Sequence, residues 1–165
     1  MSAVLSPCGL YRLRLDRTIP FPIGRLVFAF FGVNPSKADA EINDQTVMKW
    51  FGFTERNDGC RFIVGNPFAY RATDVRELAS VRDPIGPEND YWLRGIIRDA
   101  DILVPCWGSR GKLPPQLRSR LDDVMRMLVE SGKPIKTFGL TVSGDPKHPL
   151  MLGYNTPLVE WKGAA

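Results

Sequence analysis

The sequence predicts a three-layer α/β/α domain built on a central, mainly parallel four-stranded sheet. Four short and almost wholly apolar runs predict the strands, because parallel strands that are buried on both faces lack polar alternation. The runs cover residues 26–31, 61–64, 102–104 and 135–140. Segments with helical spacing of apolar residues separate them, so successive strands can run in the same direction.

The first 25 residues are expected to form an N-terminal hairpin or edge strand ahead of a core at residues 26–165. In the segment from Leu5 to Leu15, polar and apolar residues alternate weakly, and Ser6-Pro7-Cys8-Gly9 has the composition of a turn. We expect this segment to cover an edge of the sheet.

Three amphipathic segments predict the helices. The first covers residues 46–56 and the third covers residues 116–130, and a stop signal that contains glycine follows each of them. The second begins at Pro87-Glu88-Asn89-Asp90 and is expected to turn four apolar residues inward, namely Tyr91, Trp92, Ile96 and Ile97. A last short strand is predicted at residues 157–161.

Composition indicates the setting of the protein. No linker, repeat or low-complexity run divides the 165 residues, so a single domain over residues 1–165 is expected. The 22 Lys and Arg exceed the 18 Asp and Glu, and a net charge of +4 is compatible with an anionic partner such as nucleic acid. Neither a signal peptide nor a membrane-spanning run is recognisable. A cytoplasmic monomer without membrane contact is therefore expected.

Cysteine and histidine usage argues against a metal site. Cys8, Cys60 and Cys106 form no C-x-x-C pair, and the chain has one histidine, His148. Structural zinc takes four such ligands at close spacing, so no metal and no cofactor are expected. Each cysteine is expected to be a reduced, partly buried hydrophobe. Cys106 follows a predicted strand, so a nucleophile paired with His148 is the alternative.

Each predicted strand ends in a loop with polar residues. In a parallel sheet these loops lie at one edge, where open α/β sheets bind ligands. The loops cover residues 32–39, 65–71, 107–112 and 143–149. The third resembles a phosphate-cradling loop in composition but lacks the spacing of a P-loop, so ATP binding is not expected.

Several of these loop motifs resemble a bacterial and phage domain family of unknown function, over about the whole chain. The matching stretches are residues 33–39, 66–74, 84–90 and Lys147-His148-Pro149-Leu150. A more distant resemblance is to the uracil-DNA glycosylase superfamily. It rests on Gly32-Val33-Asn34-Pro35, Ile63-Val64-Gly65-Asn66 and His148-Pro149, which follow one another in the order of that superfamily.

The second resemblance implies a DNA glycosylase-like enzyme that hydrolyses the N-glycosidic bond of a uracil-like or modified pyrimidine base in DNA. Asn34 would position water or the sugar, His148 would donate to the departing base, and Asn66 would read the base edge. The substrate-binding residues implied are Gly32, Pro35, Ser36, Asn66, Phe68 and Tyr70, with Phe51 as a further stacking candidate. The phosphate-binding residues expected are Lys37, Arg71, Arg110 and Lys112.

The sequence departs from the glycosylase pattern at two positions. Asn34 stands where the strongest uracil enzymes carry Asp, and Leu150 follows the His-Pro pair where Ser is usual. Asp39 or Asp44 could instead supply a general base or bind a divalent ion. The Asn-Pro pairs could be simple strand-ending turns, and His148 could brace its loop. A base-modifying transferase, a nucleotide-processing enzyme and a non-catalytic nucleic-acid-binding module therefore stay open.

Overall fold

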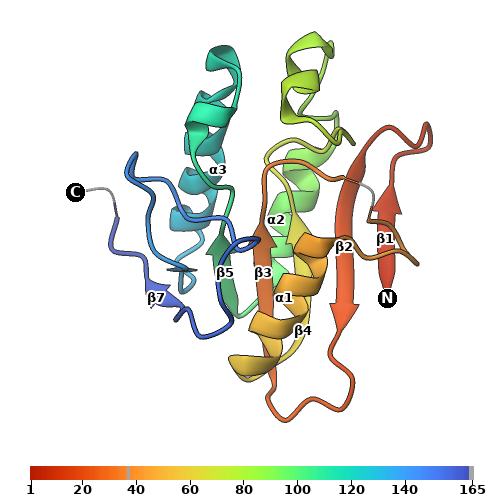
Figure 1. Cartoon of the computed structure of the whole chain (residues 1–165). Coiled ribbons are helices and arrows are strands. Elements are labelled where there is room, and N and C mark those ends of the chain that lie inside the picture. Colours follow the sequence, from red (N-terminus) through yellow and green to blue (C-terminus); the bar gives the residue numbers. More distant parts are fainter. Residues whose placement is uncertain (37, 164–165) are drawn as a thin grey trace.

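The computed structural model describes residues 1–36 and 38–163. Within these residues, a five-stranded sheet in the order β1-β2-β4-β3-β5 runs through the middle of the molecule (Figure 1). Three strands are parallel, namely β4 (Gly59–Gly65), β3 (Leu26–Phe31) and β5 (Ile102–Pro105). The hairpin of β1 (Ser2–Leu5) and β2 (Arg12–Thr18) adds two antiparallel strands beside β4. The protein is therefore an α/β protein with a mixed sheet.

The expected N-terminal hairpin is confirmed, but the mainly parallel four-stranded sheet is wrong. The hairpin extends the sheet by hydrogen bonding along β4 instead of only covering an edge. The fourth apolar run, residues 135–140, contributes a single parallel bridge from Ile135 to Leu103. Beyond it, β6 (Lys136–Thr137) pairs with β7 (Val159–Glu160) in a separate two-stranded sheet. Gly139 then adopts φ +92°, which a continuing strand cannot accommodate.

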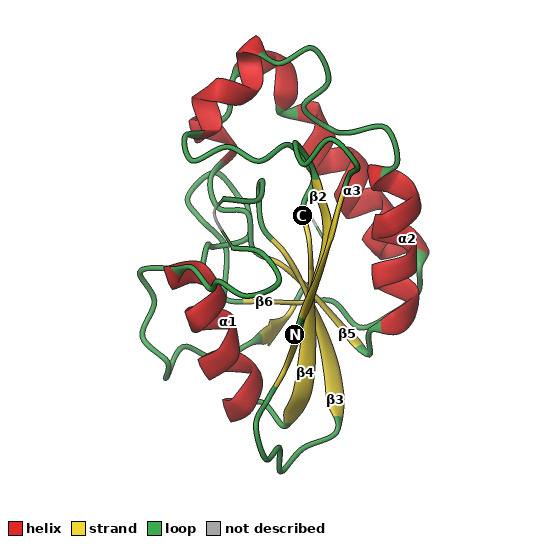
Figure 2. Ribbon diagram, turned by 90° about the vertical axis from the view of Figure 1, so that its right-hand side faces the viewer, coloured by secondary structure: helices red, strands yellow, loops and turns green. Residues whose placement is uncertain are grey.

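Helices cover both faces of the sheet, with α1 (Gln45–Arg56) on one side and α2 (Asn89–Asp99) and α3 (Ser119–Glu130) on the other (Figure 2). All three lie where the sequence predicts helices. Short 3₁₀ turns precede α3, so it begins later than expected; they are η2 (Arg110–Lys112) and η3 (Pro115–Leu117). A further one, η1 (Val75–Ser80), was not expected. No described helix is both long and apolar enough to cross a membrane.

The prediction that Tyr91 of α2 faces inward is wrong. Tyr91 is 74% exposed, whereas Leu93, Ile96 and Ile97 are buried against the sheet. At about 100° per residue, Tyr91 lies roughly 200° around the helix from Leu93 and therefore faces solvent.

The core has two parts because β3 is buried on both faces. Phe28 and Phe30 point toward α1 and join a cluster with Phe53 and Phe62. Ala29 and Phe31 point toward α2 and α3 and join a second cluster. Successive strand residues face opposite sides of a sheet, so only a wholly apolar run such as 26–31 can fill both clusters.

Candidate functional site

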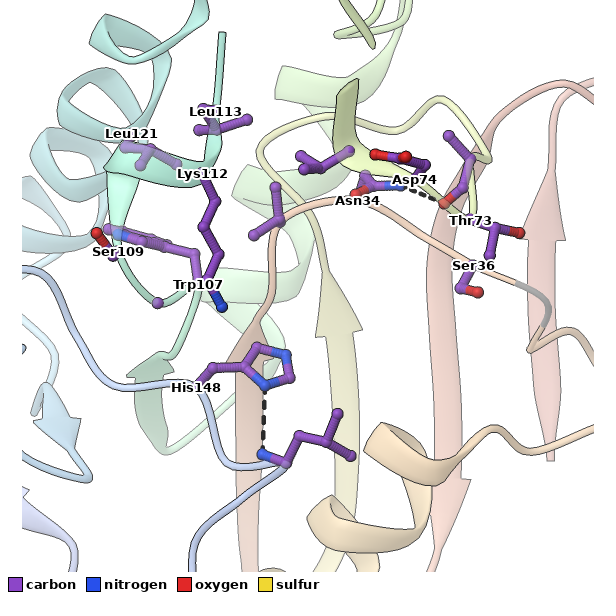
Figure 3. Close-up of a pocket in the computed structure, with 15 residues that line it drawn as sticks. Asn34, Ser36, Thr73, Asp74, Trp107, Ser109, Lys112, Leu113, Leu121 and His148 are labelled. Carbon is purple, nitrogen blue, oxygen red and sulfur yellow. Dashed lines mark hydrogen bonds between the residues drawn. The ribbon is translucent and has the colours of Figure 1, made fainter. Parts of the chain in front are cut away.

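A cavity of about 550 Å³ opens beyond the carboxyl ends of β3 and β5 (Figure 3). Its walls come from the loop after β3, the segment before η1, the loop after β5, the start of α3 and the loop that carries His148. The loop edge proposed from the sequence therefore contains a cavity. The lining residues are Val33, Asn34, Ser36, Ala72, Thr73, Asp74, Val75, Trp107, Gly108, Ser109, Lys112, Leu113, Leu121, His148 and Leu150.

Asn34 lies in this wall with its amide nitrogen already engaged. Nδ2 donates to the backbone oxygen of Ala72 at 2.7 Å and to that of Pro35 at 3.1 Å. An amide nitrogen has two hydrogens, so Oδ1 is the polar atom that the side chain can offer to a ligand. A carboxylate here would set an oxygen against two carbonyl oxygens. The position therefore requires Asn instead of an ionised Asp.

His148 lies across the same cavity in a defined protonation state. Its Nδ1 accepts a hydrogen bond from the backbone N–H of Leu150 at 3.2 Å. Burial lowers the pKa of His148 below 6.5, and the positive charge of Lys112 lowers it further, while Asp44 acts in the opposite direction. The imidazole is therefore neutral at pH 7 and carries its proton on Nε2. His148 can donate one hydrogen bond to a ligand.

The two charged side chains described in the cavity wall, Lys112 and Asp74, differ in whether they are already paired within the protein. Lys112 extends from η2 along the cavity toward His148 (Figure 3). Asp74 lies at the other end, where its side chain caps η1 and pairs with Arg76 at 2.6 Å. The hydrogen bonds from Arg76 lower the pKa of Asp74 to about 2. The carboxylate is thus ionised and already paired, and among the described residues Lys112 is the cation that lines the cavity near His148.

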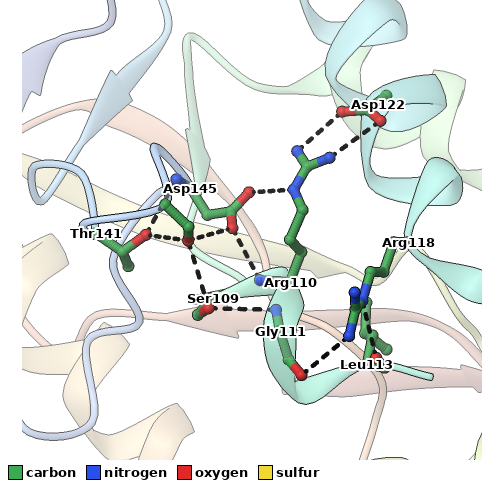
Figure 4. Close-up of polar contacts among 9 residues, drawn as sticks. Ser109, Arg110, Gly111, Leu113, Arg118, Asp122, Thr141 and Asp145 are labelled. Atoms are coloured by element: carbon green, nitrogen blue, oxygen red, sulfur yellow. Dashed lines mark hydrogen bonds and ion pairs between the residues drawn. The ribbon is translucent and has the colours of Figure 1, made fainter. Parts of the chain in front are cut away.

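A buried carboxylate joins the two loops that carry Lys112 and His148 (Figure 4). Asp145 is 1% exposed and accepts from the backbone N–H and from Nε of Arg110, both at 2.8 Å, and from Ser143 Oγ at 2.9 Å. Burial alone would raise the pKa of Asp145, but these hydrogen bonds lower it. Arg110 also pairs with Asp122 at 2.9 Å. Arg110, which was expected to hold phosphate, is therefore occupied by two carboxylates.

Gly108 allows the two loops to meet closely. Its backbone N–H donates to the oxygen of Pro146 at 2.8 Å, and its φ is +77°. A Cβ at this position would lie 3.3 Å from the Cβ of His148. Glycine is required here for both the conformation and the approach of His148.

Three predicted substrate-binding residues lie away from the cavity. Asn66 is 3% exposed, and its Oδ1 accepts from Arg12 at 3.4 Å. Phe68 is fully buried in the core beneath α2 and α3, and Tyr70 packs edge-on against Tyr11. The prediction that Asn34, Asn66 and His148 border one cavity is thus corrected. Asn34 and His148 do so, and Asn66 does not.

Asn66 is kept out of the cavity by the contact between the turn after β4 and the start of α2. The side chain of Asn89, at the start of α2, donates to the backbone oxygens of Asn66 and Pro67 at 2.9 and 3.1 Å. This holds the turn after β4 beneath the helix. Gly32 is buried as well, and a Cβ on it would lie 3.1 Å from Nδ2 of Asn66.

The remaining predicted residues are divided between the cavity and its surroundings. Ser36 lines the cavity, whereas Pro35 is buried beside it. Arg71 lines a smaller adjoining cavity with Ser36, Ala72 and Thr73. Phe51 packs against Phe62 on the opposite side of the sheet. Lys37 lies outside the described residues.

The other candidate reactive groups, namely Cys106, Asp39 and Asp44, do not line the main cavity. Cys106 is buried on the α1 side and away from the cavity, and burial raises its pKa to about 12, so the nucleophile reading is wrong. Asp39 accepts from the backbone N–H groups of Glu41 and Ile42, and Asp44 caps α1. Neither carboxylate lines the cavity. Within residues 1–36 and 38–163, no three His, Cys, Asp or Glu side chains gather as metal ligands would.

Several wall residues were not proposed from the sequence. Trp107, which is 4% exposed, forms an apolar wall with Val33, Leu113 and Leu121. Thr73 and Asp74 form part of the opposite end. A signal for Asp74 exists, because Asp74 and Glu77 have the spacing of a capping box and mark the start of η1. Nothing in the spacing of Trp107 distinguishes it from a core residue.

Comparisons with known proteins place these features in one family. Neither the curated proteins nor the solved structures contain a match to this chain. One family profile matches residues 12–150, a span that includes β2 and every residue lining the main cavity. The chain therefore belongs to the family described as "Protein of unknown function (DUF1643)".

Proposed function

We propose that this protein is a DNA glycosylase-like enzyme that hydrolyses the N-glycosidic bond of a modified pyrimidine base in DNA, in line with its distant resemblance to the uracil-DNA glycosylase superfamily. The observation that carries the proposal is the complementary pair at the main cavity. Within residues 1–36 and 38–163, no group donates to Oδ1 of Asn34 and none accepts from Nε2–H of His148, so the first is available as an acceptor and the second as a donor.

Such a pair suits the chemistry of base removal. The C1′–N bond breaks through an oxocarbenium-like state while negative charge develops on the base. The Nε2–H group of neutral His148 would donate to the base oxygen that gains this charge, and Lys112 would add a positive potential. Oδ1 of Asn34 would accept a hydrogen bond from the water that attacks C1′. The water oxygen bonds to C1′ as the C1′–N bond breaks, the proton that the water loses neutralises the departing base anion, and the products are the free base and an abasic sugar.

The charges in the cavity also favour a particular kind of base. The carboxylate in its wall, Asp74, already pairs with Arg76, so it is a poor general base for the attacking water. The leaving group must then supply more of the driving force. Pyrimidines with electron-withdrawing substituents, which form stable anions, are therefore preferred over plain uracil.

Of the substrate-binding residues implied by the resemblance, Ser36 lines the main cavity and keeps a proposed role in reading the base, whereas Asn66 does not. Asn66 is buried and does not line the cavity, so the hydroxyls of Ser36 and Thr73 are assigned to the base edge. Trp107 and Leu113 provide an apolar wall on which the ring of the base would lie.

One observation favours a second candidate, a non-catalytic nucleic-acid-binding module. The polar contacts that Asn34 and His148 make with other described residues are all to backbone groups, as expected of residues that brace loops. A base-modifying transferase or a nucleotide-processing enzyme would use the same cavity with another reactant.

Product analysis separates these functions. Purified protein is incubated with oligonucleotides that contain uracil, 5-hydroxymethyluracil, 5-formyluracil or 5-fluorouracil, and mass spectrometry follows the free base and the strand. We expect free base and an alkali-labile site, with more product from the electron-poor bases. A strand of altered mass without free base would instead identify a transferase. Intact strands across the panel, together with salt-sensitive binding, would favour the binding module.

A further inference from the structure

A second cavity, of about 280 Å³, adjoins the main one on the other side of His148. The two share part of their walls, namely Gly108, Ser109, Lys112, His148 and Leu150. The second cavity adds Thr141, Lys147, Met151 and Leu152. The two cavities therefore adjoin at His148 and Lys112, so groups of one extended ligand could occupy both.

The second cavity is positively charged. Lys112 and Lys147 both line it, and no carboxylate does so among the described residues. Neither lysine takes part in an ion pair within residues 1–36 and 38–163. The nearby carboxylate of Asp145 is buried and bonded to Arg110 and Ser143. Two ammonium groups are therefore left to attract an anion.

The two lysines lie on loops whose relative position is fixed. The backbone N–H of Gly108 donates to Pro146, and that of Lys147 donates to Gly139 at 3.0 Å. The bonds of Asp145 to Arg110 add a buried link between the same loops. An anion that binds between Lys112 and Lys147 consequently does not have to order the backbone first.

We propose that the second cavity is a phosphate subsite, in which Lys112 and Lys147 bind a phosphodiester group of the strand whose nucleotide occupies the main cavity. Lysine ammonium groups bind phosphate as point charges, and phosphate contacts position a strand without reading its sequence. The side chains of Leu150 and Leu152 provide apolar surface for the attached sugar. The identity of the strand rests on the proposed function, whereas the phosphate subsite does not.

This subsite defines the class of substrate. A nucleotide within a chain carries a phosphodiester that can reach Lys147, whereas a free base or a nucleoside does not. We therefore expect the protein to bind a dinucleotide or a longer strand in preference to the corresponding nucleoside.

The sole histidine provides a direct readout of this binding. His148 is the one histidine of the chain, so its imidazole NMR signals need no assignment in tag-free protein. The probes are thymidine and the dinucleotide thymidylyl-thymidine, each titrated into the full chain. We expect the dinucleotide to raise the pKa of His148, because its phosphodiester offsets the charge of Lys112, and thymidine to leave it unchanged.

Three variants of equal charge change make the test specific. Lys147→Met and Lys112→Met should each weaken dinucleotide binding about tenfold, the effect of losing about 1.4 kcal/mol. With longer single strands, each should reduce the slope of log K against log salt by about 0.7. Lys162→Met is the control, since Lys162 is exposed and lines neither cavity. It should match the wild type in both measurements.

The outcomes distinguish this inference from the proposed function. Binding that depends on Lys147, in a protein that releases no base, would support the phosphate subsite and contradict the glycosylase. Base release with a salt slope unchanged in Lys147→Met would overturn the subsite and leave the glycosylase standing. Equal binding of the dinucleotide to Lys147→Met, Lys162→Met and the wild type would also overturn it.

Discussion

The side-chain nitrogen of Asn34 donates a hydrogen bond to the backbone oxygen of Ala72, at 2.7 Å. This bond joins the loop after β3 to the segment that leads into η1, and both border the main cavity. It also fixes the orientation of the amide, because the second hydrogen on Nδ2 is directed to Pro35. Because Nδ2 of Asn34 is bonded to these two carbonyl oxygens, Oδ1 is the atom that Asn34 turns toward a ligand.

The substitution Asn34→Asp should therefore destabilise the fold in a pH-dependent way. Ionised, the new carboxylate repels the carbonyls of Ala72 and Pro35, at a cost of about 1–3 kcal/mol. Protonated, it can still donate one bond, so its pKa in the folded state is raised. The penalty relative to wild type should then be small at low pH and grow as the pH rises through that pKa. Urea denaturation at several pH values measures it.

Asn43→Asp is the matched control for this change. Oδ1 of Asn43 accepts from Nε of Arg17 at 2.7 Å, so a carboxylate there gains an attraction instead of a repulsion. If both variants lose the same stability at pH 7, the amide of Asn34 is not held as described.

His148 should link stability to pH. Its pKa is lower in the folded chain than the 6.5 of an unperturbed imidazole. Between these two values the unfolded chain binds more protons, so the contribution of His148 to stability is present above about 6.5 and lost as the pH falls through the folded pKa. Urea denaturation between pH 5 and 8 should show this loss in the wild type and not in His148→Gln. An NMR titration of the imidazole with a pKa at or above 6.5 would contradict it.

A side chain at position 108 should destabilise the fold and displace His148. Gly108→Ala combines a φ of +77° with a Cβ that approaches His148, so we expect a loss of about 1–2 kcal/mol from the backbone together with a displaced imidazole. Gly132→Ala has a similar φ of +69° but open space around the added Cβ. Both variants should lose stability, and only the first should shift the NMR signals of His148. Equal imidazole spectra in the two variants would rule out the contact.

The buried contacts of Asp145 with Arg110 and Ser143 should contribute far more to the free energy of unfolding than an exposed ion pair does. Asp145→Asn removes a buried charge from Arg110 and Ser143, and we expect a loss of about 2 kcal/mol. Asp123→Asn breaks the exposed pair with Arg126, which should cost less than about 0.5 kcal/mol. The stability that Asp145 contributes should fade as the pH falls, since its pKa is lowered in the folded state. Similar losses in the two variants at pH 7 would show that the contacts of Asp145 contribute no more to stability than an exposed ion pair.

The helices and the buried strands could be predicted because their signals are local. The apolar run 26–31 indicates a strand buried on both faces, and the helical spacing of apolar residues over 46–56 indicates α1. The pairing of β2 with β4 has no such signal. Arg12 and Arg17 look like solvent-exposed residues in the sequence, yet both are buried. Their guanidinium groups donate to the backbone oxygens of Ala38 and Asp39, contacts that only the folded chain brings together.

The two asparagines of the Asn-Pro turns show that prediction of the site from local sequence is limited in the same way. Asn34 and Asn66 each follow a parallel strand, and nothing local separates them. Asn66 is covered because Asn89, 23 residues later, holds its turn beneath α2. The edge of the sheet that holds the cavity was predictable from the parallel direction of the strands, whereas which polar side chains reach the cavity depends on how the helices pack over it.

The role of His148 in base release can be separated from its role in the fold. His148→Ala removes the Nε2–H donor and should lower the rate of base release about 100-fold, the loss seen when one preorganised donor to a developing anion is removed. DNA affinity should stay within about twofold of the wild type, because phosphate contacts dominate affinity and Lys112 and Lys147 remain. His148→Gln keeps an N–H donor and should recover part of the rate. Single-turnover assays and binding isotherms measure the two quantities. If the rates of both variants fall only in proportion to their folded fraction, determined by thermal melting, His148 braces its loop and takes no part in base release.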